Sequence, residues 1–137
     1  MTTGGVARQV LLDTSVVITP PTAGLVSIAD YVAVSAVTIA ELEYGVGASA
    51  DAEERLRRRR RLGAIVDAMD VIPLDSAVAG SYGLLANMVR AAGRNPRPRR
   101  LDLLIAATAE RHGLSLATRN ADDFRALDRV VHVIEVR

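Results

Sequence analysis

The chain has 137 residues, of which 50% are hydrophobic and 24% are charged, and these proportions are typical of a globular domain rather than of a disordered protein. Its net charge is +1, and it contains no cysteine, which excludes disulfides, thiolate nucleophiles and cysteine-based zinc sites. Neither a run of about 18 apolar residues nor a signal-peptide pattern is present, so we expect a cytoplasmic protein with no membrane segment. We expect a single domain over residues 1–137, in which residues 1–7 form a disordered lead-in.

Segments of strand character alternate with segments of helical character from the start of the chain. A buried strand is expected over residues 8–13, followed by a polar turn at Asp13-Thr14-Ser15 and a short helix over 23–30. A second strand over 31–35 leads into a helix that begins near Thr38 and stops at Gly45 and Gly47.

The rest of the chain continues the alternation. In order, we expect a helix over 51–68, a strand over 71–74, a helix over 76–92 capped by Asp75, a basic loop over 93–100, a helix over 100–112 ended by Gly113, a strand over 114–118, a short helix over 122–127 and a strand over 130–136. This order predicts the α/β fold class, as a three-layer α/β/α domain with a mostly parallel central sheet.

Acidic residues follow the expected strands. Asp13 ends the first strand, Glu41 lies early in the helix after the second, and Asp102 lies in the first turn of an almost wholly apolar helix. Asp122 and Asp123 come just after the strand over 114–118. Because residues past the carboxyl ends of parallel strands converge on one crevice, we expect these acids to gather around one point.

Each acid also has an ordinary structural interpretation. The segment Thr38-Ile39-Ala40-Glu41 matches a capping box, Asp13 fits an Asx turn, Asp102 fits a helix-dipole aspartate and Asp122 fits a helix cap. Asp13 and Asp102, however, adjoin segments that should be buried, where an unpaired charge is expensive. A divalent metal is the simplest partner for such acids, and carboxylate oxygens favour Mg²⁺ or Mn²⁺.

The sequence lacks the residues that several other catalytic chemistries need. All 17 basic residues are arginine, and the two histidines, His112 and His132, are expected at a helix end and on a surface strand, so a zinc-histidine cluster or a catalytic triad is unsupported. Glycine-rich phosphate-binding loops are also missing from the sequence. Metal-assisted hydrolysis of a phosphodiester is the chemistry that the remaining residues favour.

Four motifs resemble, in order and spacing, those of PIN-domain ribonucleases, and most closely those of the VapC toxins of bacterial toxin–antitoxin pairs. They are Leu11-Leu12-Asp13-Thr14-Ser15, Ile39-Ala40-Glu41-Leu42-Glu43-Tyr44-Gly45, Leu101-Asp102-Leu103-Leu104-Ile105-Ala106-Ala107-Thr108-Ala109 and Thr118-Arg119-Asn120-Ala121-Asp122-Asp123-Phe124. Any one motif is weak, but four in this order are specific, and the resemblance covers the chain from Leu11 to about Val136.

The resemblance implies a PIN-like fold and a metal-dependent endoribonuclease that uses Mg²⁺ or Mn²⁺ to hydrolyse phosphodiester bonds in structured RNA such as tRNA or rRNA. It also implies a homodimer that is neutralised by a cognate VapB-type antitoxin, whose C-terminal segment blocks the acidic crevice. Carried over by position, Asp13, Glu41 and Asp102 are catalytic metal ligands, Ser15 hydrogen-bonds within the metal site, and Thr118 supports it from the strand end.

The fourth acidic position departs from the family pattern. Many relatives have an aspartate where this chain has Asn120, while Asp123 fits the acid directly before the phenylalanine of the same motif. We therefore expect Asp123 to act as the fourth catalytic and metal-binding acid, with Asn120 as a neutral substitute that keeps an oxygen near the metal. Asp122 keeps the interpretation of a helix cap, and the number of metal ions, one or two, stays open.

Arginines are the expected RNA contacts. The loop that enters the Asp102 helix should overhang the crevice, and it carries Arg94, Arg97, Arg99 and Arg100. Their guanidinium groups suit phosphate oxygens, and such contacts would give affinity that depends on salt. The run from Arg57 to Arg61 could face RNA, the antitoxin or only water.

Two other functions remain as alternatives. A response-regulator receiver or a haloacid-dehalogenase-like phosphatase also places an aspartate at the end of its first strand, but both normally need a lysine, which this chain lacks. A non-catalytic RNA-binding or protein-binding module on a PIN-like fold would be expected to lack the acids. A metal-independent interaction of that kind would survive chelation.

Overall fold

The computed structural model describes residues 8–137, and its centre is a five-stranded sheet in which every neighbouring pair of strands is parallel. The strand order is β3-β2-β1-β4-β5. The strands are β1 (Gln9–Leu12), β2 (Tyr31–Ser35), β3 (Asp70–Ile72), β4 (Ser115–Thr118) and β5 (Val133–Glu135). The predicted parallel α/β sheet is therefore confirmed, with β1 at its centre.

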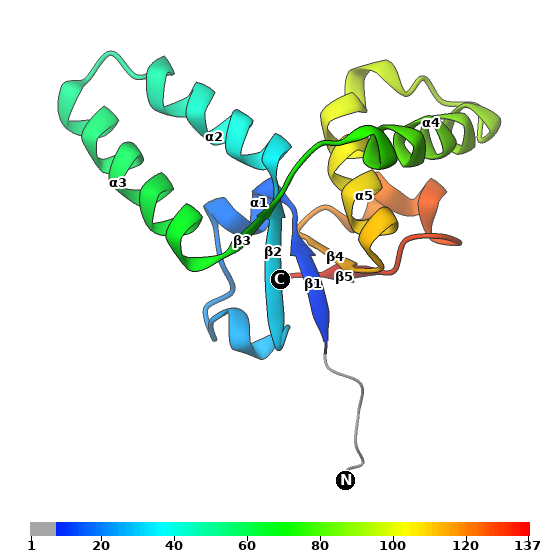
Figure 1. Ribbon diagram of the computed structural model, residues 1–137, viewed down its shortest axis with the longest axis horizontal. Coiled ribbons are helices and arrows are strands. Elements are labelled where there is room, and N and C mark those ends of the chain that lie inside the picture. Colours follow the sequence, from blue (N-terminus) through cyan, green and yellow to red (C-terminus); the bar gives the residue numbers. More distant parts are fainter. Residues whose placement is uncertain (1–7) are drawn as a thin grey trace, which may run out of the picture.

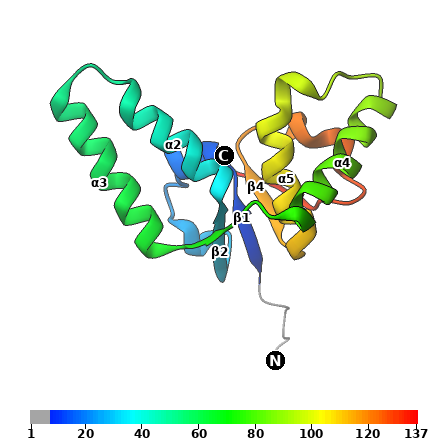
Figure 2. The same cartoon turned by 45° about the horizontal axis from the view of Figure 1, so that its top comes forward.

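Helices connect the strands and cover both faces of the sheet (Figure 1). They are α1 (Thr14–Ile18), α2 (Ala36–Ala48), α3 (Ala52–Ala68), α4 (Ser76–Ala91) and α5 (Arg100–His112), with short 3₁₀ turns η1 (Leu25–Ser27), η2 (Arg97–Arg99) and η3 (Ala121–Leu127). Figure 2 shows α2 and α3 as a helical hairpin on one side, with α4 and α5 together on the other. This arrangement confirms the three-layer α/β/α prediction.

The alternation of side chains along β1 produces the two cores. Leu11 packs in a cluster with residues of α4 and α5, including Leu85 and Ile105. Its neighbours Val10 and Leu12 point to the opposite face and pack in a second cluster with Val16 and Val17 of α1. Because β1 is buried on both faces, its end is a protected place for a polar side chain.

Some helix boundaries follow the capping residues of the sequence. Asp51 accepts a hydrogen bond from the Glu53 amide at the start of α3, and Asp75 accepts one from the Val78 amide at the start of α4. Gly113 ends α5 in the left-handed conformation, with φ of 66°, which glycine adopts without steric cost. The cap at Asp75 and the helix end at Gly113 are as predicted, whereas Asp51, which was expected as the first residue of the helix, is its N-cap.

Other expected boundaries were wrong. The residues after Asp13 form the short helix α1 rather than a polar turn, and the helix expected over 23–30 is only the 3₁₀ turn η1. Helix α2 begins at Ala36 and runs through Gly45 and Gly47 to Ala48. Glycine inside a helix costs only about 1 kcal/mol, which the packing of α2 on α3 can offset.

The structure of residues 8–137 does not test two of the expectations from the sequence. The disordered lead-in over residues 1–7 lies outside the described residues, and the single domain over 1–137 stays a prediction. Within residues 8–137, every helix is too short or too polar to cross a membrane.

Candidate active site

Asp13 stands at the carboxyl end of the central strand, directly before α1, and only 5% of it is exposed. Its Oδ2 accepts hydrogen bonds from Ser15 Oγ at 2.7 Å and from Thr118 Oγ1 at 2.9 Å. Asp13 is not paired with a basic side chain from residues 8–137. Two hydroxyl donors therefore fix one oxygen of a buried carboxylate whose charge no arginine neutralises, and the Asx-turn interpretation does not describe it.

Glu41 reaches the same end of the sheet from the second turn of α2. Its Oε1 accepts a hydrogen bond from Thr14 Oγ1 at 2.7 Å, and Thr14 also lies 3.0 Å from Thr38 Oγ1. The helix is capped instead by Ser35, whose Oγ accepts from the Val37 amide. The capping-box interpretation of Glu41 was therefore wrong, and Thr14 joins the segment after Asp13 to the segment that carries Glu41.

Asp102 lies in the first turn of α5, half-buried, and Arg99 connects it to Asp123 of η3. Arg99 Nη2 is 3.2 Å from Asp102 Oδ2 and 2.6 Å from Asp123 Oδ2. Burial raises the pKa of Asp102, Arg99 opposes that rise, and the negative charge of Asp13 adds to it. The hydrogen bond from Arg99 lowers the pKa of Asp123.

Hollows in the surface adjoin these acids. Glu41 and Asp102 line the same open hollow of about 330 Å³, together with residues 98–101. Asp102 and Asp123 line a second, smaller one of about 50 Å³, beside Arg94 and Arg99. A third hollow of about 470 Å³ lies between α2 and α3 and also reaches Glu41. The acids are thus accessible from the surface, although Asp13 itself is buried.

Comparison with known proteins identifies the family to which the chain belongs. Residues 10–130 match the PIN domain family model. The chain belongs to the PIN-domain family. Ribonuclease VapC5 of Mycobacterium tuberculosis is 37% identical over 130 residues, which are 93% of each chain. A crystal structure of the VapBC-5 toxin–antitoxin system from the same organism has a TM-score of 0.78 and is 37% identical, covering 96% of this PIN domain chain and 99% of the other.

A second toxin–antitoxin complex shares the fold. The crystal structure of FitAcB from Neisseria gonorrhoeae superimposes with a TM-score of 0.79 and 31% identity, covering 92% of this chain and 96% of the other. The PIN-domain resemblance inferred from the four sequence motifs is thereby confirmed. Ribonucleases of this family generally use divalent metal ions.

The donor chemistry of this PIN domain fits such an ion. Asp13, Glu41 and Asp102 offer only oxygen, the ligand that Mg²⁺ and Mn²⁺ prefer, and the buried Asp13 has no cationic partner from residues 8–137. Within those residues, however, no three acidic or histidine side chains lie close enough together to hold one ion. The acids therefore gather around one point less closely than the sequence suggested, although Arg99 brings Asp102 and Asp123 together.

Of the other residues that the sequence predicts for the site, some support it and others lie on the surface around it. Asn120 is exposed, and its amide donates to Thr118 Oγ1 at 3.1 Å, so it buttresses the site through its backbone. Asp122 pairs with Arg125 on the surface instead of capping η3. Of the loop arginines, Arg97 and Arg100 are exposed, Arg94 lines the smaller hollow, and Arg99 holds the acids.

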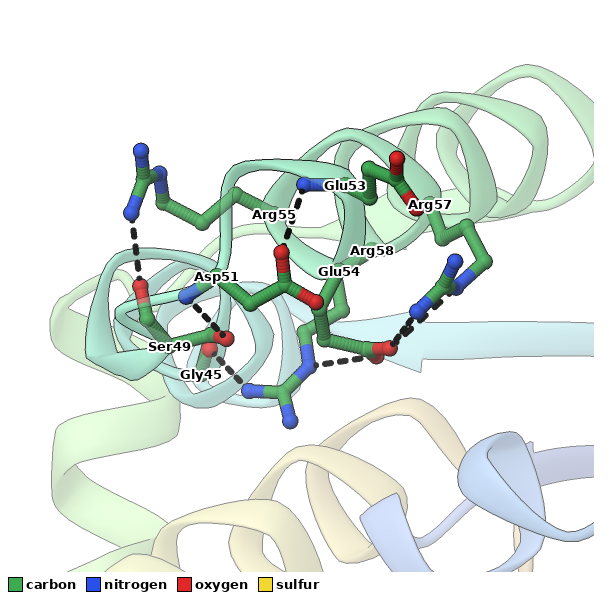
Figure 3. A network of polar contacts seen from close by, with 8 residues as sticks. All are labelled: Gly45, Ser49, Asp51, Glu53, Glu54, Arg55, Arg57 and Arg58. Atoms are coloured by element: carbon green, nitrogen blue, oxygen red, sulfur yellow. Dashed lines mark hydrogen bonds and ion pairs between the residues drawn. The ribbon is translucent and has the colours of Figure 1, made fainter.

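Most of the run Arg57–Arg61 has a structural role. Arg58 donates to the Gly45 carbonyl at 2.6 Å and pairs with Glu54, and the network that closes the turn between α2 and α3 is drawn in Figure 3. Arg59 pairs with Glu43 of α2 at 2.6 Å, and Arg61 donates to the carbonyls of Val17 and Ile18. These contacts attach α3 to α2 and α1.

Sequence reasoning missed two functions of residues beside the acids. Thr14 was treated only as part of a turn, although its place directly after Asp13 could have suggested a partner across the crevice. Arg99 was expected to contact RNA, although its spacing of three residues from Asp102 at a helix start is typical of an ion pair.

Proposed function

We propose that this PIN domain is a metal-dependent endoribonuclease toxin, which hydrolyses phosphodiester bonds in structured RNA and is neutralised by a cognate VapB-type antitoxin. The observation that supports it most is the buried Asp13 carboxylate, held by two hydroxyls and close enough to raise the pKa of Asp102. Its relatives support the activity, because the similar proteins include a named ribonuclease and toxins from toxin–antitoxin complexes.

Asp13, Glu41 and Asp102 are the residues proposed to hold Mg²⁺ or Mn²⁺, with Asp123 as a fourth acid. Such an ion, when bound, supplies polarisation of the scissile phosphate and a more acidic water molecule. Ser15 and Thr118 orient Asp13 for this role, and Thr14 orients Glu41. Asn120 supports Thr118 through its amide.

Arginines at the entrance are proposed to bind the RNA backbone. Arg100 lines the hollow between Glu41 and Asp102, Arg97 is exposed next to Pro98 of its rim, and Arg94 adjoins Asp123. Phosphate contacts of this kind position RNA without reading its sequence, so the choice of substrate depends on RNA shape. The proposed substrates are tRNA or rRNA, and the proposed assembly is a homodimer with the antitoxin. The cytoplasmic location stays a prediction.

The first test is cleavage of a total tRNA and rRNA pool by the purified chain. We expect discrete fragments in the presence of Mg²⁺ or Mn²⁺ and none in EDTA. The Asp102→Asn variant should lose at least about a hundredfold in rate, the size of effect typical of a missing catalytic group. The matched control is Asp122→Asn, because Asp122 is an exposed acid that pairs with Arg125 on the surface.

Two outcomes would contradict the proposal. Cleavage that persists in EDTA, or in Asp102→Asn, would indicate another chemistry. Absence of any cleavage, together with RNA or partner binding that EDTA does not weaken, would favour a non-catalytic binding module.

A further inference from the structure

Arg99 occupies the position of a cation between two acids of the proposed metal site. Its Nη2 lies 2.6 Å from Asp123 Oδ2 and 3.2 Å from Asp102 Oδ2, and its side chain is 32% exposed. Within residues 8–137, no other basic side chain pairs with Asp13, Glu41, Asp102 or Asp123. Arg99 therefore pairs with two of the four acids, and the positive charge of Arg94 also acts on Asp123.

Local structure explains why Arg99 points at these acids. It is the last residue of η2 and the N-cap position of α5, so Asp102, three residues later, lies on the same side of the helix start. Asp123 comes from η3, where the neighbouring Phe124 is almost fully buried and anchors the turn. The planar guanidinium can bind two carboxylates at once. Arg99 thus joins two segments that are far apart in the sequence.

A divalent ion would compete with this arrangement. Mg²⁺ binds carboxylate oxygens at about 2.0–2.1 Å, which is closer than a guanidinium nitrogen approaches. The Oδ2 atom of Asp102 cannot hold both partners at full strength, and two cations beside one carboxylate repel each other. The guanidinium has space to move, because Arg99 and Asp102 line both the larger and the smaller hollow.

Resting on the proposed metal-dependent function, we propose that Arg99 is a displaceable internal cation, whose guanidinium bridges Asp102 and Asp123 and must leave Asp102 before a divalent ion binds there. Arg99 thereby sets the affinity of the site for metal. It is a positioning residue for the acids, and it differs in role from Arg97 and Arg100, which form no ion pair with them.

The test is a titration of the full chain with Mn²⁺, in which free Mn²⁺ is measured by electron paramagnetic resonance. We expect Arg99→Gln to bind Mn²⁺ about fivefold more tightly than the unmodified chain, which corresponds to the loss of a partly exposed ion pair. The matched control is Arg125→Gln, which removes a surface arginine that pairs with Asp122 in the same turn. This control should bind Mn²⁺ as the unmodified chain does.

A second measurement needs no substitution. In the ¹⁵N-labelled chain, Mg²⁺ should shift the assigned Arg99 Nε–Hε signal toward the position of a free arginine side chain. A signal that stays unchanged at saturating Mg²⁺ would overturn the proposal. Unchanged or weaker Mn²⁺ binding by a folded Arg99→Gln variant would overturn it as well.

A further variant separates this proposal from the proposed function. If Asp102→Asn loses Mn²⁺ binding while Arg99→Gln binds as the unmodified chain does, the metal site stands and only the role of Arg99 falls. If Asp102→Asn binds Mn²⁺ as tightly as the unmodified chain, the metal site itself falls.

Discussion

At the scale of single residues, the site depends on how each carboxylate is compensated. Asp13 is buried and relies on the hydroxyls of Ser15 and Thr118, whereas Asp102 relies on a guanidinium. Hydroxyl donors orient a carboxylate without neutralising it, so the negative charge of Asp13 remains available and acts on Asp102. The two acids are therefore coupled before any ligand binds.

The raised pKa of Asp102 has a consequence for stability. Burial disfavours its ionised form, so the folded chain holds a proton there more tightly than the unfolded chain does, and this group's contribution to stability falls as pH rises from about 3.8 through the folded pKa. Asp102→Asn, which removes the charge, should therefore raise the melting temperature at pH 7 in EDTA. Thermal unfolding followed by circular dichroism measures this.

The pH dependence of the same thermal melts provides a control. The advantage of Asp102→Asn should shrink as the pH approaches 3.8, where the unmodified carboxyl is also protonated. Asp122→Asn, at an exposed position, should change the melting temperature little at either pH. A lower melting temperature for Asp102→Asn at pH 7 would mean that its bond with Arg99 outweighs its burial.

At the scale of elements, the helical hairpin of α2 and α3 is held by few buried contacts. Leu62 is the one buried residue of α3, and the adjacent run of arginines adds polar bonds from Arg58, Arg59 and Arg61 to α2 and α1. Because exposed ion pairs contribute little, packing of Leu62 should dominate the stability of the hairpin.

Leu62→Ala should lower the free energy of unfolding by about 2–5 kcal/mol, since it truncates a side chain that is only 4% exposed. Leu56→Ala is the matched control on the same helix, because Leu56 is 49% exposed, and it should cost about 1 kcal/mol or less. Urea unfolding measures both. Equal losses in the two variants would show that α3 is held by its polar bonds instead.

At the scale of the whole molecule, the basic residues are divided between two sides of the sheet. The run on α3 lies on one side, and the loop before α5 lies on the other (Figure 2). The net charge of +1 hides this division, since the arginines of α3 largely bind within the chain whereas Arg97 and Arg100, in the segment that leads to Asp102, are exposed. RNA affinity should therefore come from the loop before α5.

Arg97→Gln, made in the inactive Asp102→Asn background, should weaken RNA binding and reduce the slope of log affinity against log salt by about 1. The control is Arg60→Gln, which removes an exposed arginine of α3. Fluorescence anisotropy with labelled tRNA, measured over a series of salt concentrations, gives both slopes. A change for Arg60→Gln that is as large as that for Arg97→Gln would place the RNA on the α2–α3 side.

The sequence by itself determined the alternation of strands and helices, the cap at Asp75, the position of Asp13 at the end of a strand and that of Asp102 in the first turn of a helix. These features are local, because hydrophobic periodicity and capping residues act within a few residues of the chain. Burial on both faces of β1 also followed from its apolar run, and with it the expectation that Asp13 needs a special partner.

Only the tertiary structure decided how the acids are paired. Thr14 bonds Glu41, Thr118 bonds Asp13, and Arg99 joins Asp102 to Asp123. The contacts Thr14–Glu41, Thr118–Asp13 and Arg99–Asp123 all span more than 20 residues of sequence. The pair Arg99–Asp102 is local, but it was hidden because an arginine near a crevice fits RNA as well as it fits a carboxylate. Side-chain partners across a parallel sheet depend on strand order and register, which local sequence signals do not encode.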